Sequence, residues 1–307
     1  MDPIRAEALS KRFGKLTAVD RLTLSVAEGE IFGLVGPDGA GKTTTMRLLT
    51  GILAPSEGEA WVDGCHVVRE AEAVKERIGY MSQRFGLYPD LTVQENIDFY
   101  ADLYEVPPGV RAGKMERLLA FSNLTPFRRR RAGNLSGGMK QKLGLACALV
   151  HTPRVLFLDE PTNGVDPVSR RDFWRILYQL LRERVTIFVS TAYLDEAERC
   201  SRIGLMHQGR LLALDTVDGV KGLMRGALLE VRCERTREAA RTLRPWRAAL
   251  HGDALHVSVD DADAGREAVE TALRKAGFAD VETRLIEPSL EDVFTSAIPQ
   301  DRPEAAP

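Results

Sequence analysis

The fold of this chain is decided by the stretch Glu30-Ile31-Phe32-Gly33-Leu34-Val35-Gly36-Pro37-Asp38-Gly39-Ala40-Gly41-Lys42-Thr43. Residues 30–35 have the pattern of a short buried strand, and a helix is expected to begin near Lys42. The turn between them fits G-x-x-x-x-G-K-[ST], in which glycines leave room for backbone N–H groups to surround phosphate oxygens. A buried strand, this turn and a helix in that order predict a triphosphate site.

The residues of this phosphate loop divide into those that hold phosphate and one that holds a metal ion. The positive end of the helix dipole points at the phosphates. Lys42 is expected to reach the β- and γ-phosphates of ATP, and the Thr43 hydroxyl is expected to bind Mg²⁺. The predicted nucleotide contacts of the loop are Gly36, Pro37, Asp38, Gly39, Ala40, Gly41, Lys42, Thr43 and Thr44.

Two neighbouring carboxylates follow another apolar segment, the predicted strand at 154–158. In phosphate-loop folds an aspartate at such a strand end helps to hold Mg²⁺, which assigns that role to Asp159. Glu160 is then placed to accept a proton from the attacking water. The alternative is that both carboxylates only cap the next element, and the phosphate loop upstream favours the catalytic interpretation.

Composition and charge narrow the class of protein. The chain has 307 residues, 44% hydrophobic and 28% charged, which is typical of a globular protein with two domains. A formal net charge of −2 gives no general attraction to nucleic acid, and no nucleic-acid partner is expected. No stretch approaches the ~18 apolar residues of a membrane span, and the first residues lack the apolar core of a signal peptide.

Cysteine and histidine usage gives no sign of a disulfide framework or a metal cage. The four cysteines are widely spaced and are expected to be free thiols in a reducing compartment. The five histidines show no metal-ligand spacing.

Strand-like and helix-like segments alternate through residues 1–222, the predicted first domain. Short, evenly apolar strands at 30–35, 154–158 and 185–190 indicate a parallel sheet that is covered on both faces. The strand pattern stops at about 88–152, which predicts a helical insertion. Its expected helices lie at 92–104, 114–121 and 138–150.

A second domain is predicted at 226–298. Its segments follow the order β-α-β-β-α-β of the ferredoxin-like split motif, which gives an α+β domain. A further helix begins after Ser289 as N-cap, and the tail at 299–307 is expected to be disordered. The expected segments are strand 227–233, helix 236–243, strands 246–250 and 254–259, helix 264–275 and strand 281–286.

Residues 4 to about 220 resemble the nucleotide-binding domain of ABC transporters. The resemblance rests on motifs in the family's order, and it implies the P-loop NTPase (RecA-like) α/β fold with a helical insertion. The motifs are the phosphate loop, Gln83 after a predicted strand at 77–82, Leu135-Ser136-Gly137-Gly138-Met139-Lys140-Gln141, Asp159-Glu160 and Asn163-Gly164-Val165-Asp166-Pro167.

The segment Ser136-Gly137-Gly138 looks like the family signature. The resemblance implies that these residues contact the γ-phosphate of an ATP molecule held by a second ATP-binding domain. The local chemistry agrees, because an N-cap serine and two glycines that open a helix form an anion site. The implied assembly is a dimer of ATP-binding domains, either a homodimer or a heterodimer, with ATP between them.

The resemblance also implies roles for three single residues. Gln83 would contact Mg²⁺ and the attacking water, and would act in catalysis with Lys42 and Glu160. Asp166 matches the family's D-loop and is placed among the nucleotide contacts. Phe13 lies where the family has an aromatic ring that stacks on adenine.

One position departs from the family pattern. After the strand that ends at Ser190 the family has a histidine that contacts the γ-phosphate, and this chain has Ala192 in its place. A methyl group cannot donate a hydrogen bond. The expectation is therefore hydrolysis that is weakened rather than absent.

The segment Pro288-Ser289-Leu290-Glu291-Asp292-Val293-Phe294 resembles the end of ATPase subunits of drug-resistance-type exporters. It implies an exporter ATPase that works with an integral membrane permease on a separate chain. Such a subunit would be cytoplasmic, peripheral on the inner face of the cell membrane. Two alternatives stay open: a catalytically degenerate, nucleotide-dependent regulatory or binding module, and a soluble ABC ATPase with no role in transport.

Overall fold

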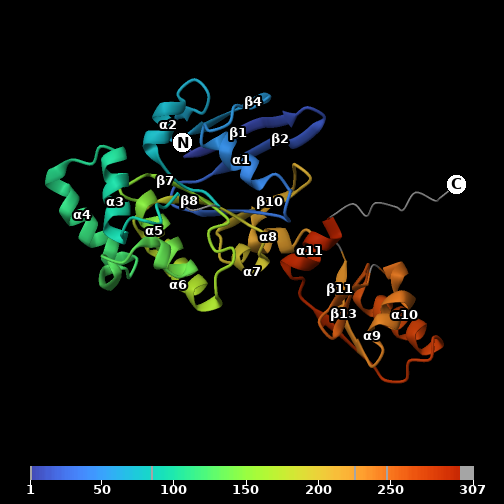
Figure 1. Ribbon diagram of the computed structural model, residues 1–307. Helices are drawn as coiled ribbons and strands as arrows, with labels where there is room; N and C mark the ends of the chain where they lie inside the picture. The colour runs from blue at the N-terminus through green and yellow to red at the C-terminus, as the bar shows by residue number, and fades with distance from the viewer. Residues whose placement is uncertain (1, 84–85, 225, 247, 298–307) are drawn as a thin grey trace. The chain divides into compact units, whose positions relative to one another are not determined.

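The computed structural model describes residues 2–83, 86–224, 226–246 and 248–297. They form two compact units that divide between Leu214 and Asp215 (Figure 1). The predicted disordered tail at 299–307 lies outside the described residues.

A six-stranded sheet forms the centre of the first unit, with the order β10-β9-β3-β8-β7-β6. From β9 to β6 all neighbours are parallel, as predicted. β3, β7 and β8 are buried along their whole length, which is why they have no polar alternation. The strands are β3 (Ile31–Val35), β6 (Ile78–Met81), β7 (Val155–Asp159), β8 (Thr186–Thr191), β9 (Arg202–His207) and β10 (Arg210–Thr216).

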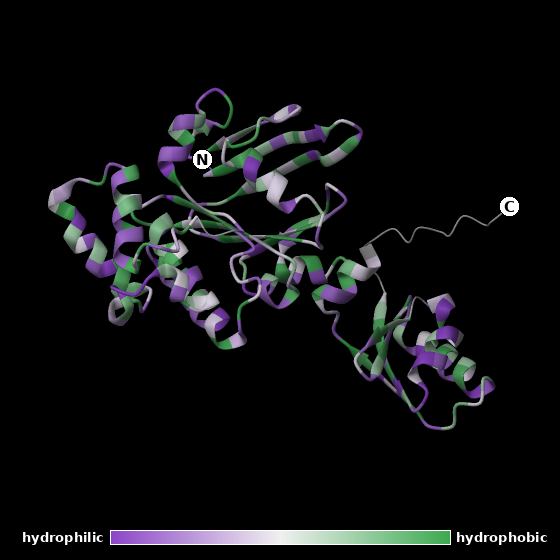
Figure 2. Ribbon diagram, in the orientation of Figure 1, coloured by the Kyte–Doolittle hydropathy of each residue, from purple (hydrophilic) through white to green (hydrophobic). Residues whose placement is uncertain are grey.

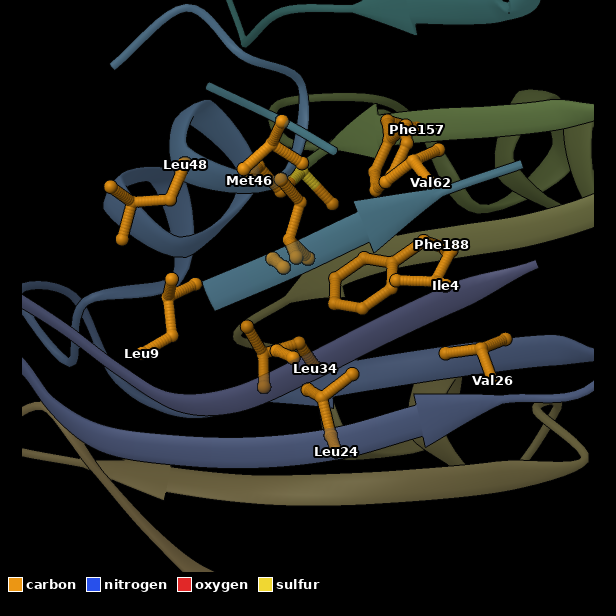
Figure 3. Close-up of a cluster of buried hydrophobic side chains, with 14 of the residues drawn as sticks. Ile4, Leu9, Leu24, Val26, Leu34, Met46, Leu48, Val62, Phe157 and Phe188 are labelled. Carbon is orange, nitrogen blue, oxygen red and sulfur yellow. The ribbon is translucent and has the colours of Figure 1, made fainter. Parts of the chain in front are cut away.

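A second, antiparallel sheet with the order β2-β1-β4-β5 covers part of the first unit, and the sequence analysis did not predict it. Apolar side chains from both sheets and from α1 (Lys42–Leu49) form one buried cluster (Figure 3). This face of the central sheet is therefore covered by a second sheet as well as by α1. The strands are β1 (Ile4–Phe13), β2 (Leu16–Val26), β4 (Glu57–Val62) and β5 (Cys65–His66).

Helices α3 to α7 lie on the other side of the first unit and include the predicted insertion, whereas α2 lies beside the antiparallel sheet (Figure 1). Thr92 begins α3 with a capping box to Glu95. The next helix begins at Pro108 rather than at the predicted Lys114, because proline is favoured in the first helical turn. The helices are α2 (Ala71–Arg77), α3 (Val93–Leu103), α4 (Pro108–Phe121), α5 (Gly137–Ala148), α6 (Pro167–Arg182) and α7 (Leu194–Ala197).

The second unit contains an antiparallel sheet with the order β12-β13-β11-β14. If β11, β12, β13 and β14 are numbered 1 to 4 in chain order, the sheet read from β14 has the order 4-1-3-2. This is the ferredoxin-like arrangement of the β-α-β-β-α-β motif. β12 is shorter than the predicted strand at 246–250, since Arg244–Trp246 forms a 3-10 turn around Pro245. The elements are α8 (Val217–Lys221), β11 (Ala227–Cys233), α9 (Thr236–Thr242), β12 (Ala249–His251), β13 (Ala254–Val259), α10 (Ala262–Lys275), β14 (Val281–Ile286) and α11 (Leu290–Ala297).

The hydropathy of the residues matches this arrangement of sheets and helices. The helices of both units are drawn with alternating polar and apolar segments, as expected for helices with one face on a core (Figure 2). In the described part of the chain, no helix combines the length and the apolar character that crossing a bilayer requires.

Candidate functional site

The phosphate loop opens a pocket at one edge of the central sheet. Because β3, β6, β7 and β8 run parallel, the residues that follow them meet at the same edge. The pocket has a volume of about 770 Å³. It is lined by Phe13, Leu16, Thr17, Ala18, Asp38, Gly39, Ala40, Gly41, Lys42, Thr43, Thr44, Gln83, Glu160, Gln208 and Gly209.

The glycines of the loop are required by its backbone. Gly41 has φ of 105°, a region that side chains disfavour, and a Cβ there would lie 2.3 Å from the Ala18 carbonyl oxygen. A Cβ on Gly36 would lie 2.1 Å from the Met206 carbonyl oxygen. Both contacts are too close for any other residue, so the loop can form only with glycine at these positions.

Lys42 is buried and held by its own loop. Its Nζ donates to the carbonyl oxygens of Gly36, at 2.7 Å, and Pro37, at 3.0 Å. The same Nζ lies 3.1 Å from Glu160 Oε1. The predicted phosphate-binding lysine and the predicted catalytic carboxylate are therefore in direct contact.

Glu160 is fixed from several sides at the end of β7. Its Oε2 accepts from Gln83 Nε2 at 2.9 Å and from Asn163 Nδ2 at 3.3 Å. Its backbone N–H donates to Ser190, and its own φ is 48°. The structure thus joins Gln83, Lys42 and Glu160 into one cluster, and it adds Asn163 and Ser190, which the sequence analysis did not single out.

Asp159 offers an unsatisfied oxygen beside the loop. Its Oδ1 accepts from Ser190 Oγ at 2.7 Å and from Thr43 Oγ1 at 3.1 Å. The buried Oδ2 has no hydrogen-bond partner among the described residues. Burial raises the pKa of Asp159 above its ordinary value, although the hydrogen bonds from Ser190 and Thr43 oppose the shift.

These groups fit a magnesium ion. A buried carboxylate oxygen with no partner, a threonine hydroxyl and the Gln83 amide are the hard oxygen donors that Mg²⁺ prefers. Since the Gln83 nitrogen is engaged by Glu160, its amide oxygen is left for a cation.

Comparisons with known proteins agree with this geometry. The family model described as ABC transporter matches residues 19–163. The daunorubicin resistance ATP-binding protein DrrA2 of Streptomyces coeruleorubidus is 36% identical over 302 residues, covering 95% of this chain and 93% of that protein. The chain belongs to the ATP-binding proteins of ABC transporters. Members of this family are ATPases.

Two further comparisons define how far the similarity extends. The probable multidrug ABC transporter ATP-binding protein YbhF of Escherichia coli K12 is 52% identical over 211 residues, covering 68% of this chain. This chain spans only 36% of the length of YbhF. A solved ATP-binding subunit of an ABC transporter is 27% identical with a TM-score of 0.65, covering 71% of this chain and 92% of that chain. The predicted P-loop NTPase fold is confirmed.

The segment that resembles the family signature, Ser136-Gly137-Gly138, lies outside the phosphate-loop pocket. Ser136 is the N-cap of α5 and accepts from the Met139 N–H at 3.3 Å. Gly137 faces open space, whereas a Cβ on Gly138 would lie 2.5 Å from Ser169 Cβ. Ser136, Gly137 and Gly138 are not among the residues that line the pocket, so the chain does not bring them to its own phosphate loop.

Asp166 and Phe13 occupy different settings. Asp166 caps α6 by accepting from the N–H groups of Val168 and Ser169, and the hydrogen bond from Ser169 lowers the pKa of Asp166. It does not line the pocket either. Phe13 does line it and is 49% exposed. The Lys11 ammonium lies 5.2 Å from the centre of the Phe13 ring, so a base would stack on the opposite face of that ring.

The position of the missing family histidine lies in a separate hollow of about 220 Å³ beside Glu160. Ala192 lines this hollow with Tyr193, whose hydroxyl donates to Asn163 Oδ1 at 3.3 Å. The Arg170 guanidinium lies 4.4 Å from the centre of the Tyr193 ring. Tyr193 is thus linked through Asn163 to Glu160, while the methyl group of Ala192 leaves the hollow without a donor at that point.

Proposed function

We propose that this protein binds MgATP and hydrolyses it as the ATP-binding subunit of a drug-exporting ABC transporter whose permease is a separate polypeptide. The observation that carries the proposal is the contact of Glu160 with both Lys42 and Gln83 at the phosphate-loop pocket. The printed names of DrrA2 and YbhF, which refer to daunorubicin resistance and multidrug transport, support an export role.

In this mechanism Lys42 exchanges its present partners for phosphate oxygens of ATP. The γ-phosphate draws the ammonium away from Glu160, whose carboxylate then accepts a proton from the attacking water. Gln83 and Asn163 hold that carboxylate in place. Asp159, Thr43 and Gln83 would hold Mg²⁺, which offsets negative charge on the β- and γ-phosphates when it is bound.

A second ATP-binding domain would complete the site. Ser136, Gly137 and Gly138 are not part of the chain's own pocket lining and would face the γ-phosphate bound by the partner domain, with Asp166 nearby. The partner is a second copy of this chain or a different ATP-binding domain. ATP then favours closure of the two domains through contacts that only the triphosphate provides.

The permease contact is assigned to the segment after Gln83 and to α3. Tyr88 is 45% exposed and its ring packs edge-on against Phe99, at a centroid distance of 4.6 Å. The Asn96 side chain holds both the N–H and the carbonyl of Tyr88, which fixes this aromatic pair to α3. An exposed apolar pair on a rigid support suits a short helix of a membrane permease at the inner face of the cell membrane.

The proposal is tested by copurification and by activity. Tagged protein from detergent-solubilised membranes is expected to bring a multi-span membrane protein with it, and the complex is expected to release phosphate from ATP in the presence of Mg²⁺. Phosphate release without a membrane partner would contradict the export role while leaving the ATPase in place.

A second function is favoured by Ala192. A chain with Ala192 where the family has a γ-phosphate-contacting histidine would suit a nucleotide-dependent binding module with little turnover. The two are distinguished by the turnover number of the purified complex, since a binding module would retain ATP affinity without sustained phosphate release.

Ala192→His is expected to raise the rate of ATP hydrolysis about tenfold. The imidazole would enter the hollow of about 220 Å³ and donate to the γ-phosphate, and one hydrogen bond to a charged group is worth about 1.5 kcal/mol. The measurement is steady-state phosphate release at saturating MgATP. Ala192→Leu fills similar space without a donor and is expected to give no gain, whereas equal rates in parent and histidine variant would show that the missing donor does not limit turnover.

A further inference from the structure

Two histidines and two carboxylates meet in the second unit. His256 Nδ1 lies 2.7 Å from Asp292 Oδ1, and His251 Nε2 lies 3.2 Å from Glu291 Oε2. The two imidazole rings are stacked, with centroids 4.2 Å apart and planes within 4°. Ligand atoms of His251, His256 and Asp292 all lie within 4.8 Å of one another.

The fold brings these residues together from three segments. His251 ends β12 and pairs with Ala254, while His256 pairs with Ala249, so both imidazoles lie on the same face of the β12–β13 hairpin. The carboxylates belong to the first turn of α11, more than thirty residues further along the chain. The cluster therefore connects the β12–β13 hairpin to α11, a helix that is distant from the hairpin in the sequence.

The Asp292 carboxylate is oriented by a second set of contacts. Its Oδ2 accepts from the backbone N–H of Ser289 at 2.9 Å and from the Ser289 hydroxyl. Its Oδ1 is thereby directed at His256, and both Asp292 and His256 are buried. Ligands of metal sites are held by such outer hydrogen bonds.

The charge of the cluster matches a divalent cation. Glu291 and Asp292 carry two negative charges, Asp292 at a buried position and Glu291 at an exposed one. Within the described part of the chain, neither carboxylate forms an ion pair with a lysine or an arginine.

We propose that His251, His256, Glu291 and Asp292 form a binding site for a divalent transition-metal ion, with Zn²⁺ as the best match. Two imidazole nitrogens and two carboxylate oxygens are a donor set that Zn²⁺ takes with four ligands at about 2.0 to 2.2 Å. The ligand atoms of His251, His256 and Asp292 lie within 4.8 Å of one another, compared with roughly 3.3 Å between ligands of a tetrahedral site. Because the two ring planes are within 4° of parallel, the partly exposed His251 ring has to turn toward the ion when it binds. Zinc would lock the start of α11 onto the β12–β13 hairpin.

The site is tested by zinc titration of the full-length protein after chelation and dialysis. Excess Mg²⁺ is included, because it occupies oxygen sites such as Asp159 but competes poorly for imidazole ligands. One Zn²⁺ per chain is expected by isothermal titration calorimetry. His251→Ala, at a partly exposed position, and His256→Ala are each expected to weaken binding at least about tenfold.

His207→Gln changes a histidine of the first unit and is expected to bind zinc as the parent does. Circular dichroism and thermal melting of each variant show whether it is folded. If the parent binds no zinc, or if a folded His251→Ala variant binds it with parental affinity, the proposed site is wrong. Replacement of Zn²⁺ by Co²⁺ gives a second readout, since four-coordinate cobalt in this site is expected to show strong visible absorption that the His251→Ala variant lacks.

Discussion

Glu160→Gln lowers the rate of ATP hydrolysis at least about a hundredfold and leaves ATP affinity equal to the parent's or higher. A carboxamide cannot accept the proton of the attacking water, and loss of a general base typically costs a factor of about 10² to 10⁴. In the parent, Lys42 Nζ lies 3.1 Å from Glu160 Oε1. ATP affinity is preserved in the variant because the neutral glutamine side chain does not compete with phosphate for Lys42.

The measurement pairs phosphate release with equilibrium binding of ATP. Glu183→Gln makes the same chemical change at an exposed carboxylate that pairs with Arg117, and it is expected to keep parental turnover. A Glu160→Gln variant with turnover within about threefold of the parent would remove Glu160 from the catalytic role. The contact with Lys42 and Gln83 would then be structural.

The second large effect is expected for Lys42→Ala, which lowers ATP affinity as well as turnover. The ammonium is the buried cation of the phosphate loop, held by the carbonyl oxygens of Gly36 and Pro37. A charge-assisted hydrogen bond is worth about 1.5 to 3 kcal/mol, so ATP affinity falls about 10- to 100-fold. Turnover falls further, because the γ-phosphate is no longer positioned for attack by water.

Titration with MgATP and a single-turnover assay separate the two effects. Lys114→Ala serves as the control, because Lys114 bonds Thr152 within the helical region and does not line the phosphate-loop pocket. Parental affinity and turnover in Lys42→Ala would mean that the triphosphate binds elsewhere, and the proposed function would fail with it.

The phosphate loop and the carboxylate pair could be predicted from the sequence because both depend on local signals. Glycine spacing fixes the loop, and a fully apolar strand places Asp159 and Glu160 at its end. The clustering of Glu160 with Lys42 and Gln83 followed from parallel strands ending at one edge. Strands β11 and β14 were predicted with their observed bounds because turns flank them clearly.

The antiparallel sheet of the first unit was missed although part of its pairing is local. β1 and β2 form a hairpin through Gly14-Lys15, where Phe13 pairs with Leu16, whereas the pairing of Ile4 with Val62 is distant and has no local sequence signal. The strand β1 also has several bulges that interrupt its alternation of polar and apolar residues. Sequence periodicity alone could not separate it from irregular structure.

The histidine cluster was missed for a related reason. A search for metal-ligand spacing looks for residues a few positions apart, whereas Asp292 comes from a helix that follows β14. Only the antiparallel hairpin and the position of α11 bring it to His251 and His256. Chemistry that depends on tertiary contacts between distant segments leaves no local pattern to find.

Glu160 has a left-handed backbone conformation, with φ of 48°, which lowers the stability of the fold at a residue that ATP hydrolysis is proposed to require. Glycine is the amino acid that adopts this conformation without strain, and it would relieve about 1 kcal/mol or more. It would also delete the carboxylate beside the triphosphate. Selection for a more stable fold would therefore favour glycine at this position, whereas selection for ATP hydrolysis favours glutamate. The chain has the conformationally strained glutamate.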